Sequence, residues 1–197
     1  MCHKPPWPKV DGGTVATARM VEGLAASGIE VNVVALSTPK HPGVGRAPGG
    51  IVMETIPVDT RPRVVPALAN LTRKGSYQLE RFFTPQVHHF VTERVRDFRP
   101  DIVQLDGVGV LPCLADLRSV FSGVVVYRAH NVEHQIIRDR SMASRKRLAR
   151  WWLSLQAIRL EKEETAACRA VDGVVAISEP VAAWCRRRTH RPVTVIG

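Results

Sequence analysis

The sequence lacks any long apolar run. None of its stretches approaches the roughly 18 apolar residues that a membrane-spanning helix needs. The first six residues, MCHKPP, contain no apolar segment of the kind found in a secretory signal. Both absences favour a cytoplasmic protein.

Cysteine is scarce, with four residues in 197. They are Cys2, Cys113, Cys168 and Cys185, and no two of them form a CxxC pair of the type that binds zinc. Their wide spacing argues against a disulfide framework and favours free thiols in a reducing compartment.

Several motifs of enzyme chemistry are also missing. There is no GxGxxG fingerprint and no Walker lysine, so a dinucleotide site or a P-loop is disfavoured. The chain has no GxSxG elbow, no Cys/His dyad and no DxD metal box. Chemistry based on a protein nucleophile or a resident metal ion is therefore not indicated.

The residues that are present favour an α/β protein. Short Val-rich runs alternate with helix-like stretches, the pattern of βαβ units and a parallel sheet, and the runs are apolar on both faces. We predict one Rossmann-like, doubly wound, mostly parallel domain over residues 1–197. The expected strands are 31–36, 51–58, 101–105, 123–128 and 173–177, with a last strand that begins near Val193.

Helices are predicted between these strands, at 14–27, at 78–98, and over 136–169 as one long helix or two in series. The Pro- and Gly-rich stretch 39–50 is expected to be a loop. Where a doubly wound sheet needs its first central strand, only Met1–His3 precede a Pro-rich loop, so this strand is expected to be mostly absent or a stub.

Two adjacent glycines, Gly12 and Gly13, lie where the first strand would turn into the first helix. Without Cβ atoms they allow backbone amides to approach a ligand, and the start of the helix adds a positive dipole end. The expected ligand is a diphosphate or a sugar phosphate. The alternative is a tight turn without a ligand.

A second polar segment follows the strand at 123–128. Arg128 closes that strand and His130, Asn131 and Glu133 come next, at the sheet edge where ligands bind in open α/β folds. His130 can bond a sugar hydroxyl or a phosphate oxygen, and Arg128 adds positive charge. The alternative is a structural histidine that caps the next helix.

Residues 130–134 also match the HxxEH pattern of some zinc proteases. That site needs both histidines on one helical turn. Because His130 follows a strand directly, we do not expect a metal site here.

The net charge of +10 favours anionic partners. Nucleic acid is one alternative, although no recognisable nucleic-acid-binding motif is present. Basic residues surround Trp151 and Trp152, so this helix could contact an anionic membrane from the cytoplasmic side. The plainer interpretation is a solvated basic face with one tryptophan packed in the core.

Several segments, in this order along the chain, resemble the N-terminal half of GT4-like sugar transferases of the GT-B fold. They are the proline loop and GG turn at 5–13, the helix-to-strand passage LAASGIEVNVV at 24–34, RPDIV at 99–103, RAHNVE at 128–133, Glu161 with VDGVVAIS at 171–178, and VTVI at 193–196.

This resemblance implies a retaining transfer of a hexosyl-type sugar from a nucleotide-sugar donor, with no other cofactor. Gly12 and Gly13 would lie beside the donor diphosphate and the acceptor, and His130 beside the transferred sugar. Asn131, Glu133 and Ser178 match further motif positions. The acceptor would be a sugar, such as a lipid-linked or surface polysaccharide.

The family's nucleotide-binding residues belong to a C-terminal domain that this sequence does not contain. The resemblance therefore implies that the domain is missing or supplied by a partner chain, and that residues 1–197 alone are inactive. An exposed domain interface would also favour a homodimer. The alternative to a transferase is a non-catalytic Rossmann-like binding module. The sequence names neither the sugar, the nucleotide nor the acceptor.

Overall fold

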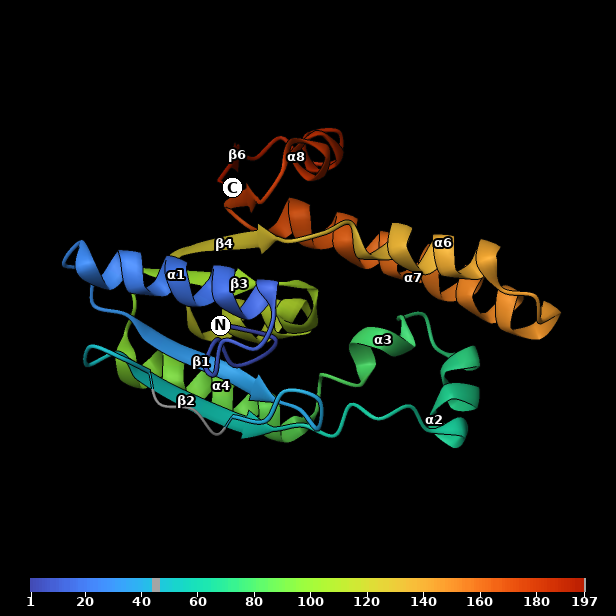
Figure 1. Cartoon of the computed structure of the whole chain (residues 1–197), viewed down its shortest axis with the longest axis horizontal. Coiled ribbons are helices and arrows are strands. Elements are labelled where there is room, and N and C mark those ends of the chain that lie inside the picture. Colours follow the sequence, from blue (N-terminus) through green and yellow to red (C-terminus); the bar gives the residue numbers. More distant parts are fainter. Residues whose placement is uncertain (44–46, 197) are drawn as a thin grey trace.

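The computed structural model describes residues 1–43 and 47–196 (Figure 1). Residues 44–46 of the predicted loop, and Gly197, lie outside the described residues. The strands are β1 (Asn32–Ser37), β2 (Val52–Pro57), β3 (Ile102–Asp106), β4 (Val124–Ala129), β5 (Gly173–Ala176) and β6 (Val193–Val195). β1 pairs with β2, and β3 to β6 pair in sequence order, with every pairing parallel. The predicted parallel α/β architecture is confirmed.

The first strand is a stub that joins the two halves of the sheet. Cys2 bridges Ala35 of β1 on one side and Asp106 of β3 on the other. Its amide donates to the carbonyl of Val34 at 2.8 Å, and the amide of Asp106 donates to the carbonyl of Met1 at 2.7 Å. The chain order therefore reverses on either side of this stub, and the carboxyl edge at such a reversal is where doubly wound sheets bind ligands.

Helices cover both faces of the sheet. They are α1 (Gly12–Ala26), α2 (Val64–Ala69), α3 (Tyr77–Glu80), α4 (Pro85–Phe98), α5 (Leu114–Val120), α6 (Glu133–Ala143), α7 (Arg147–Ala170) and α8 (Glu179–Arg186), with 3₁₀ turns η1 (Asn70–Thr72) and η2 (Val108–Cys113). Alternate side chains of β1 point to opposite faces of the sheet and pack against different helices. Val33 and Ala35 pack with α1, whereas Val34 and Leu36 belong to the core that contains the apolar face of α4.

The single helix predicted at 78–98 is wrong. The chain forms the short α3, breaks at 81–84, and begins α4 at Pro85. Thr84 caps α4 through its side chain, which accepts from the amide of Val87, and Pro85 occupies the first turn, where a missing N–H costs nothing. The i/i+4 apolar stripe of the sequence crosses this break but does not form one buried face, because Leu79 is buried in the core while Phe83 is exposed.

The region predicted as 136–169 forms two helices, α6 and α7, which pack against each other as a hairpin (Figure 1). The strand predicted at 51–58 is present as β2, but the expectation that it is apolar on both faces is wrong. As an edge strand, β2 is only partly buried, and its Glu54 pairs with Arg94 of α4 at 3.1 Å. Among the described residues no helix is long and apolar enough to cross a membrane.

Candidate functional site

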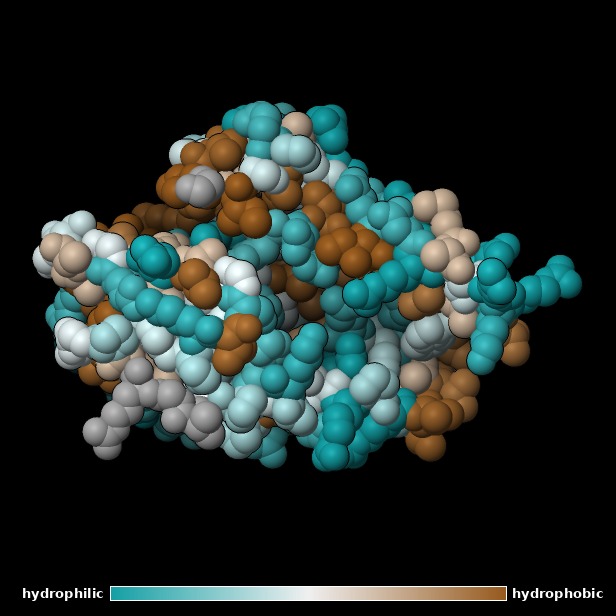
Figure 2. Space-filling view, viewed as in Figure 1, coloured by the Kyte–Doolittle hydropathy of each residue, from teal (hydrophilic) through white to brown (hydrophobic). Residues whose placement is uncertain are grey.

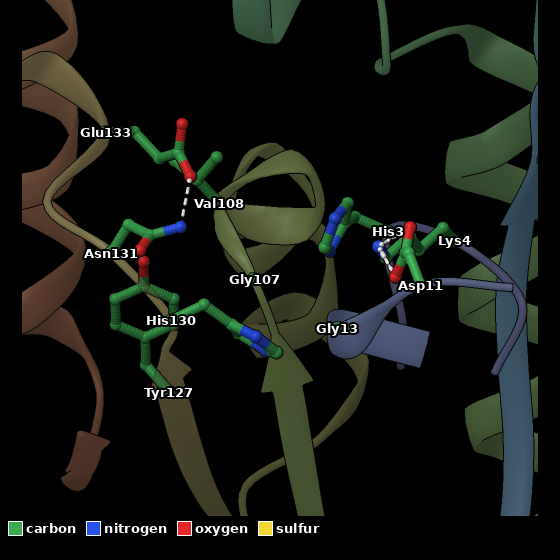
Figure 3. Close-up of a pocket in the computed structure, with 10 residues that line it drawn as sticks. All are labelled: His3, Lys4, Asp11, Gly13, Gly107, Val108, Tyr127, His130, Asn131 and Glu133. Atoms are coloured by element: carbon green, nitrogen blue, oxygen red, sulfur yellow. Dashed lines mark hydrogen bonds and ion pairs between the residues drawn. The ribbon is translucent and has the colours of Figure 1, made fainter. Parts of the chain in front are cut away.

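A cavity of about 260 Å³ opens at the carboxyl edge of the sheet, beside the N-terminal stub (Figure 3). The stub, the turn before α1, the end of β3 and the end of β4 all reach it, which is the position expected for a ligand site in this fold. Its lining residues are His3, Lys4, Asp11, Gly13, Gly107, Val108, Tyr127, His130, Asn131 and Glu133.

His130 is held by a buried carboxylate. Its Nε2 lies 2.8 Å from Oδ1 of Asp106, the last residue of β3, and the side chains are 13% and 3% exposed. Because Asp106 accepts hydrogen bonds, we assign the imidazole proton to Nε2. Nδ1 of His130 has no partner among the described residues and is left as an acceptor.

Asp106 is itself fixed from two further directions. Arg128 donates to its Oδ1 at 3.0 Å, and the hydroxyl of Thr17 on α1 donates to its Oδ2 at 2.8 Å. Burial favours the neutral acid, but His130 and Arg128 outweigh it and hold the pKa of Asp106 well below its usual range. The carboxylate is therefore charged at neutral pH and fixes the orientation of His130.

His3 forms the opposite wall. Its Nδ1 lies 2.9 Å from the backbone carbonyl of Asp106, and its ring meets the ring of His130 edge to face, with 6.1 Å between the centroids. Burial lowers the pKa of His3, so its imidazole is neutral at neutral pH. Gly107 packs against this ring at a φ of +87°, and a Cβ there would overlap the imidazole. Glycine is therefore required at this position.

The glycine turn begins α1 with a capping box. Asp11 accepts from the amide of Thr14 at 2.8 Å, and the Thr14 hydroxyl accepts from the amide of Asp11 at 3.0 Å. Lys4 donates to both carboxylate oxygens of Asp11 at 2.8 Å, and this bond lowers the pKa of Asp11. In the described part of the chain the amides of Gly12 and Gly13 donate no hydrogen bond. They remain available to an anion.

On the far wall of the cavity, the side-chain amide of Asn131 donates to the carboxylate of Glu133 at 3.3 Å (Figure 3). Burial raises the pKa of Glu133, the first residue of α6. The first two backbone amides of α6 are already bonded within the chain and are not free for a ligand. Glu164 of α7 accepts from the backbone amides of Glu133 and His134, at 2.9 and 3.1 Å.

The two histidines of the HxxEH pattern face different partners. Nδ1 of His134 lies 2.7 Å from Glu164 and its ring packs on Trp184, whereas His130 faces Asp106. Over residues 1–43 and 47–196, no group of three or more His, Cys, Asp or Glu side chains is placed to hold a metal ion.

Of the residues singled out from the sequence, Gly13, His130, Asn131 and Glu133 line the cavity. Gly12 lies next to it in the turn. Arg128 lies beneath the cavity with its charge paired to Asp106, so its expected contact with a ligand stays a prediction. Ser178 is the N-cap residue of α8, after β5, and does not line the cavity.

Among the residues of the site that sequence reasoning missed are Val108, Tyr127, His3, Lys4, Asp11, Asp106 and Gly107. For the last two a signal existed, because they directly follow the strand predicted at 101–105 and so fall on the same sheet edge as His130.

Comparison with known proteins agrees with this architecture. Two solved structures of sucrose-phosphate synthase from Thermosynechococcus elongatus are similar in fold. One matches with a TM-score of 0.64 and 17% identity over 100% of this chain and 46% of that one. The other matches with a TM-score of 0.55 and 16% identity over 93% of this chain and 84% of that one.

The chain thus spans about half the length of the longer synthase chain. No curated protein matches it. Residues 10–197 match the family model described as Glycosyltransferase Family 4, which is nearly the whole sequence. The chain therefore belongs to glycosyltransferase family 4.

Proposed function

We propose that this chain is the acceptor-side half of a retaining sugar transferase that uses a nucleotide-sugar donor. The observation that supports the proposal most strongly is the convergence of Gly13 and His130 on one cavity at the carboxyl edge of the sheet. The free amides of the glycine turn suit the donor diphosphate, and the unpartnered Nδ1 of His130 suits a sugar hydroxyl.

The chemistry needs positioning more than a protein nucleophile. When the bond between sugar and phosphate breaks, negative charge grows on the leaving diphosphate, and fixed donors at a helix start stabilise it. His130 is already oriented by Asp106 before any substrate arrives, which reduces the reorganisation needed for transfer. Asn131 and Glu133 line the same cavity, and we expect them to contact hydroxyl groups of the transferred sugar or the acceptor.

Most of the nucleotide site is proposed to come from a further domain or a partner chain, and residues 1–197 alone are expected to be inactive. We also propose a cytoplasmic enzyme that contacts the membrane from its inner face and acts on a lipid-linked or surface polysaccharide. The support is that Leu148 and Trp151, at 83% and 56% exposure, lie among basic residues at the start of α7.

The chain is first joined to a nucleotide-binding half encoded in the same or the adjacent reading frame. The test is release of nucleoside diphosphate by this joined protein from a panel of nucleotide sugars. His130→Ala should lower turnover about a hundredfold or more. His190 is exposed between α8 and β6 and does not line the cavity, so His190→Ala is the matched control and should leave turnover unchanged.

Equal turnover in the two variants would contradict the role of His130. If no nucleotide sugar is turned over by the joined protein, the transferase proposal itself is wrong. The anomeric configuration of the product, read by NMR, decides between retention and inversion.

A further inference from the structure

A second cavity, of about 380 Å³, is lined by residues of α2, α3, α6 and α7. Its wall is mainly apolar and aromatic, with Tyr77, Ile137 and Trp152 prominent. The rings of Tyr77 and Trp152 meet edge to face, with 6.2 Å between their centroids. Such a wall favours an aliphatic or other apolar body.

Two uncharged polar residues of this cavity, Tyr77 and Gln156, use their polar groups within the chain. The amide of Tyr77 donates to Gln156 at 2.7 Å, and the side-chain amide of Gln156 donates to Asn70 at 3.0 Å. The hydroxyl of Tyr77 accepts from the amide of Arg63 and donates to its carbonyl, at 2.9 and 3.0 Å. These two residues therefore offer a neutral polar ligand few open partners.

Two arginines in the wall have charges that are not neutralised. Arg81 donates to the carbonyl of Thr60 and lies over the ring of Tyr77, 5.3 Å from its centroid. Its Nε is buried without an acceptor, and burial lowers the pKa of Arg81. Neither Arg81 nor Arg140 forms an ion pair with any residue that the structure describes. A half-buried cation without a counter-charge favours an anionic ligand.

One face of α6 connects this cavity with the site around His130. Glu133 lines the first cavity, whereas Ile137 and Arg140, four and seven residues later, line the second. At a rise of about 1.5 Å per residue, Glu133 and Arg140 are about 10 Å apart along the helix axis. A short saccharide attached to a group at Arg140 is long enough to cross that distance.

Apolar residues are exposed at the outer rim. Val64, Val65 and Leu68 of α2 are 76%, 76% and 60% exposed. Figure 2 shows this apolar surface over α2, at the lower right, bordered by hydrophilic residues. An apolar rim beside cations is suited to the surface of a bilayer and to a lipid tail that enters from it.

We infer that this second cavity is the acceptor site and that it binds a phosphate-bearing lipid, with the phosphate at Arg81 and Arg140 and the tail against Ile137 and Trp152. The acceptor sugar, attached to that phosphate, then spans the distance along α6 to His130. This inference rests on the transferase function proposed above and names its acceptor class.

The test is isothermal titration calorimetry of the chain with decyl phosphate below its micelle concentration. Because recognition needs both parts, decyl phosphate should bind at least tenfold more tightly than inorganic phosphate or 1-decanol. Arg81→Gln and Arg140→Gln should each weaken binding about tenfold, the effect of one charged hydrogen bond. Arg187→Gln removes the same charge from an exposed position at the end of α8, outside the cavity lining, and should change nothing.

Equal binding by all variants, or equal binding of inorganic phosphate and decyl phosphate, would overturn the inference. If Arg81→Gln does not fold, Arg140→Gln decides, since Arg140 is exposed on its helix. Transfer to a hydrophilic acceptor without any decyl phosphate binding would also overturn it and leave the transferase function standing. Binding of decyl phosphate without turnover of any nucleotide sugar would contradict the transferase function and leave the cavity as a binding site for a phosphate-bearing lipid.

Discussion

Asp106 and His130 come from neighbouring parallel strands and meet with 2.8 Å between Oδ1 and Nε2. The sheet register pairs Asp106 with Arg128, and His130 follows two residues later at the same sheet edge. The carboxylate is buried and charged, and it fixes which imidazole nitrogen carries the proton. The orientation of His130 is therefore set by a buried residue of the protein and not by a ligand.

The first prediction concerns the tautomer of His130. In Asp106→Asn the new amide can donate to Nε2, so the proton of the neutral ring should move to Nδ1. Long-range ¹H–¹⁵N NMR spectra of the imidazoles distinguish the two tautomers. The same tautomer in the wild-type chain and the variant would show that Asp106 does not set the proton position.

Stability should depend on the same carboxylate. Asp106→Asn leaves Arg128 buried without its charge partner and should cost about 3–5 kcal/mol in urea unfolding. The double variant with Arg128→Met should cost less than the two single variants together. Arg61→Met, which breaks an exposed pair with Asp59, should cost less than about 1 kcal/mol.

This contribution has a defined pH dependence. Because the pKa of Asp106 is lowered in the folded state, its stabilisation is complete above the unfolded value of about 4 and is lost as the pH falls further. The difference between the wild-type chain and Asp106→Asn should therefore shrink below about pH 4. A difference that stays constant to pH 2 would contradict the assignment.

The contribution of Glu133 to stability should depend on pH in the opposite sense to that of Asp106. Its pKa is raised in the folded state by burial, so the ionised carboxylate costs stability at neutral pH and costs nothing below about pH 4. Glu133→Gln should raise the unfolding free energy by about 1 kcal/mol or less at pH 7.5 and have no effect near pH 3.5. Glu179 begins α8 as Glu133 begins α6 but is exposed, so Glu179→Gln should be neutral or slightly destabilising.

The two kinds of glycine at the site should respond differently to alanine. Gly107→Ala forces a side chain into a left-handed conformation and against the ring of His3, so it should destabilise the fold by about 1–3 kcal/mol or more. Gly12 has open space around its Cα, and Gly12→Ala should be neutral or stabilising by about 0.5 kcal/mol. Thermal unfolding of both variants tests this, and equal losses would refute the distinction.

Much of the sheet could be predicted because apolar runs report burial directly. The strand expected at 123–128 is β4 at Val124–Ala129, and the strand expected at 101–105 is β3 at Ile102–Asp106. Helix boundaries were harder to predict. The stripe from Leu79 to Val95 crosses a break that only the cap at Thr84 and Pro85 reveals, and α2, α5 and α8 were not predicted.

The site was predictable where it is local in sequence. His130 and Gly13 follow from the position of each at a strand or helix end. The contacts that define their environment are not local. His3 and Asp106 are 103 residues apart in the chain, and Thr17 and Arg128 are 111 apart. Periodicity contains no information on such pairings, which only the strand order establishes.

The stub at Met1–His3 has a consequence for how the domain opens. In the described residues, Cys2 supplies the bridges between β1 and β3, so a single short segment makes one hydrogen-bonded sheet from two. The two parts of the sheet should be coupled least strongly at this segment. Amide hydrogen exchange should therefore give different protection for α1, β1 and β2 than for β3 to β6. Gly13 belongs to one unit and His130 to the other. A brief separation at this seam would therefore take the candidate site apart and uncover Val34 and Leu36 of β1, which pack in the core shared with α4.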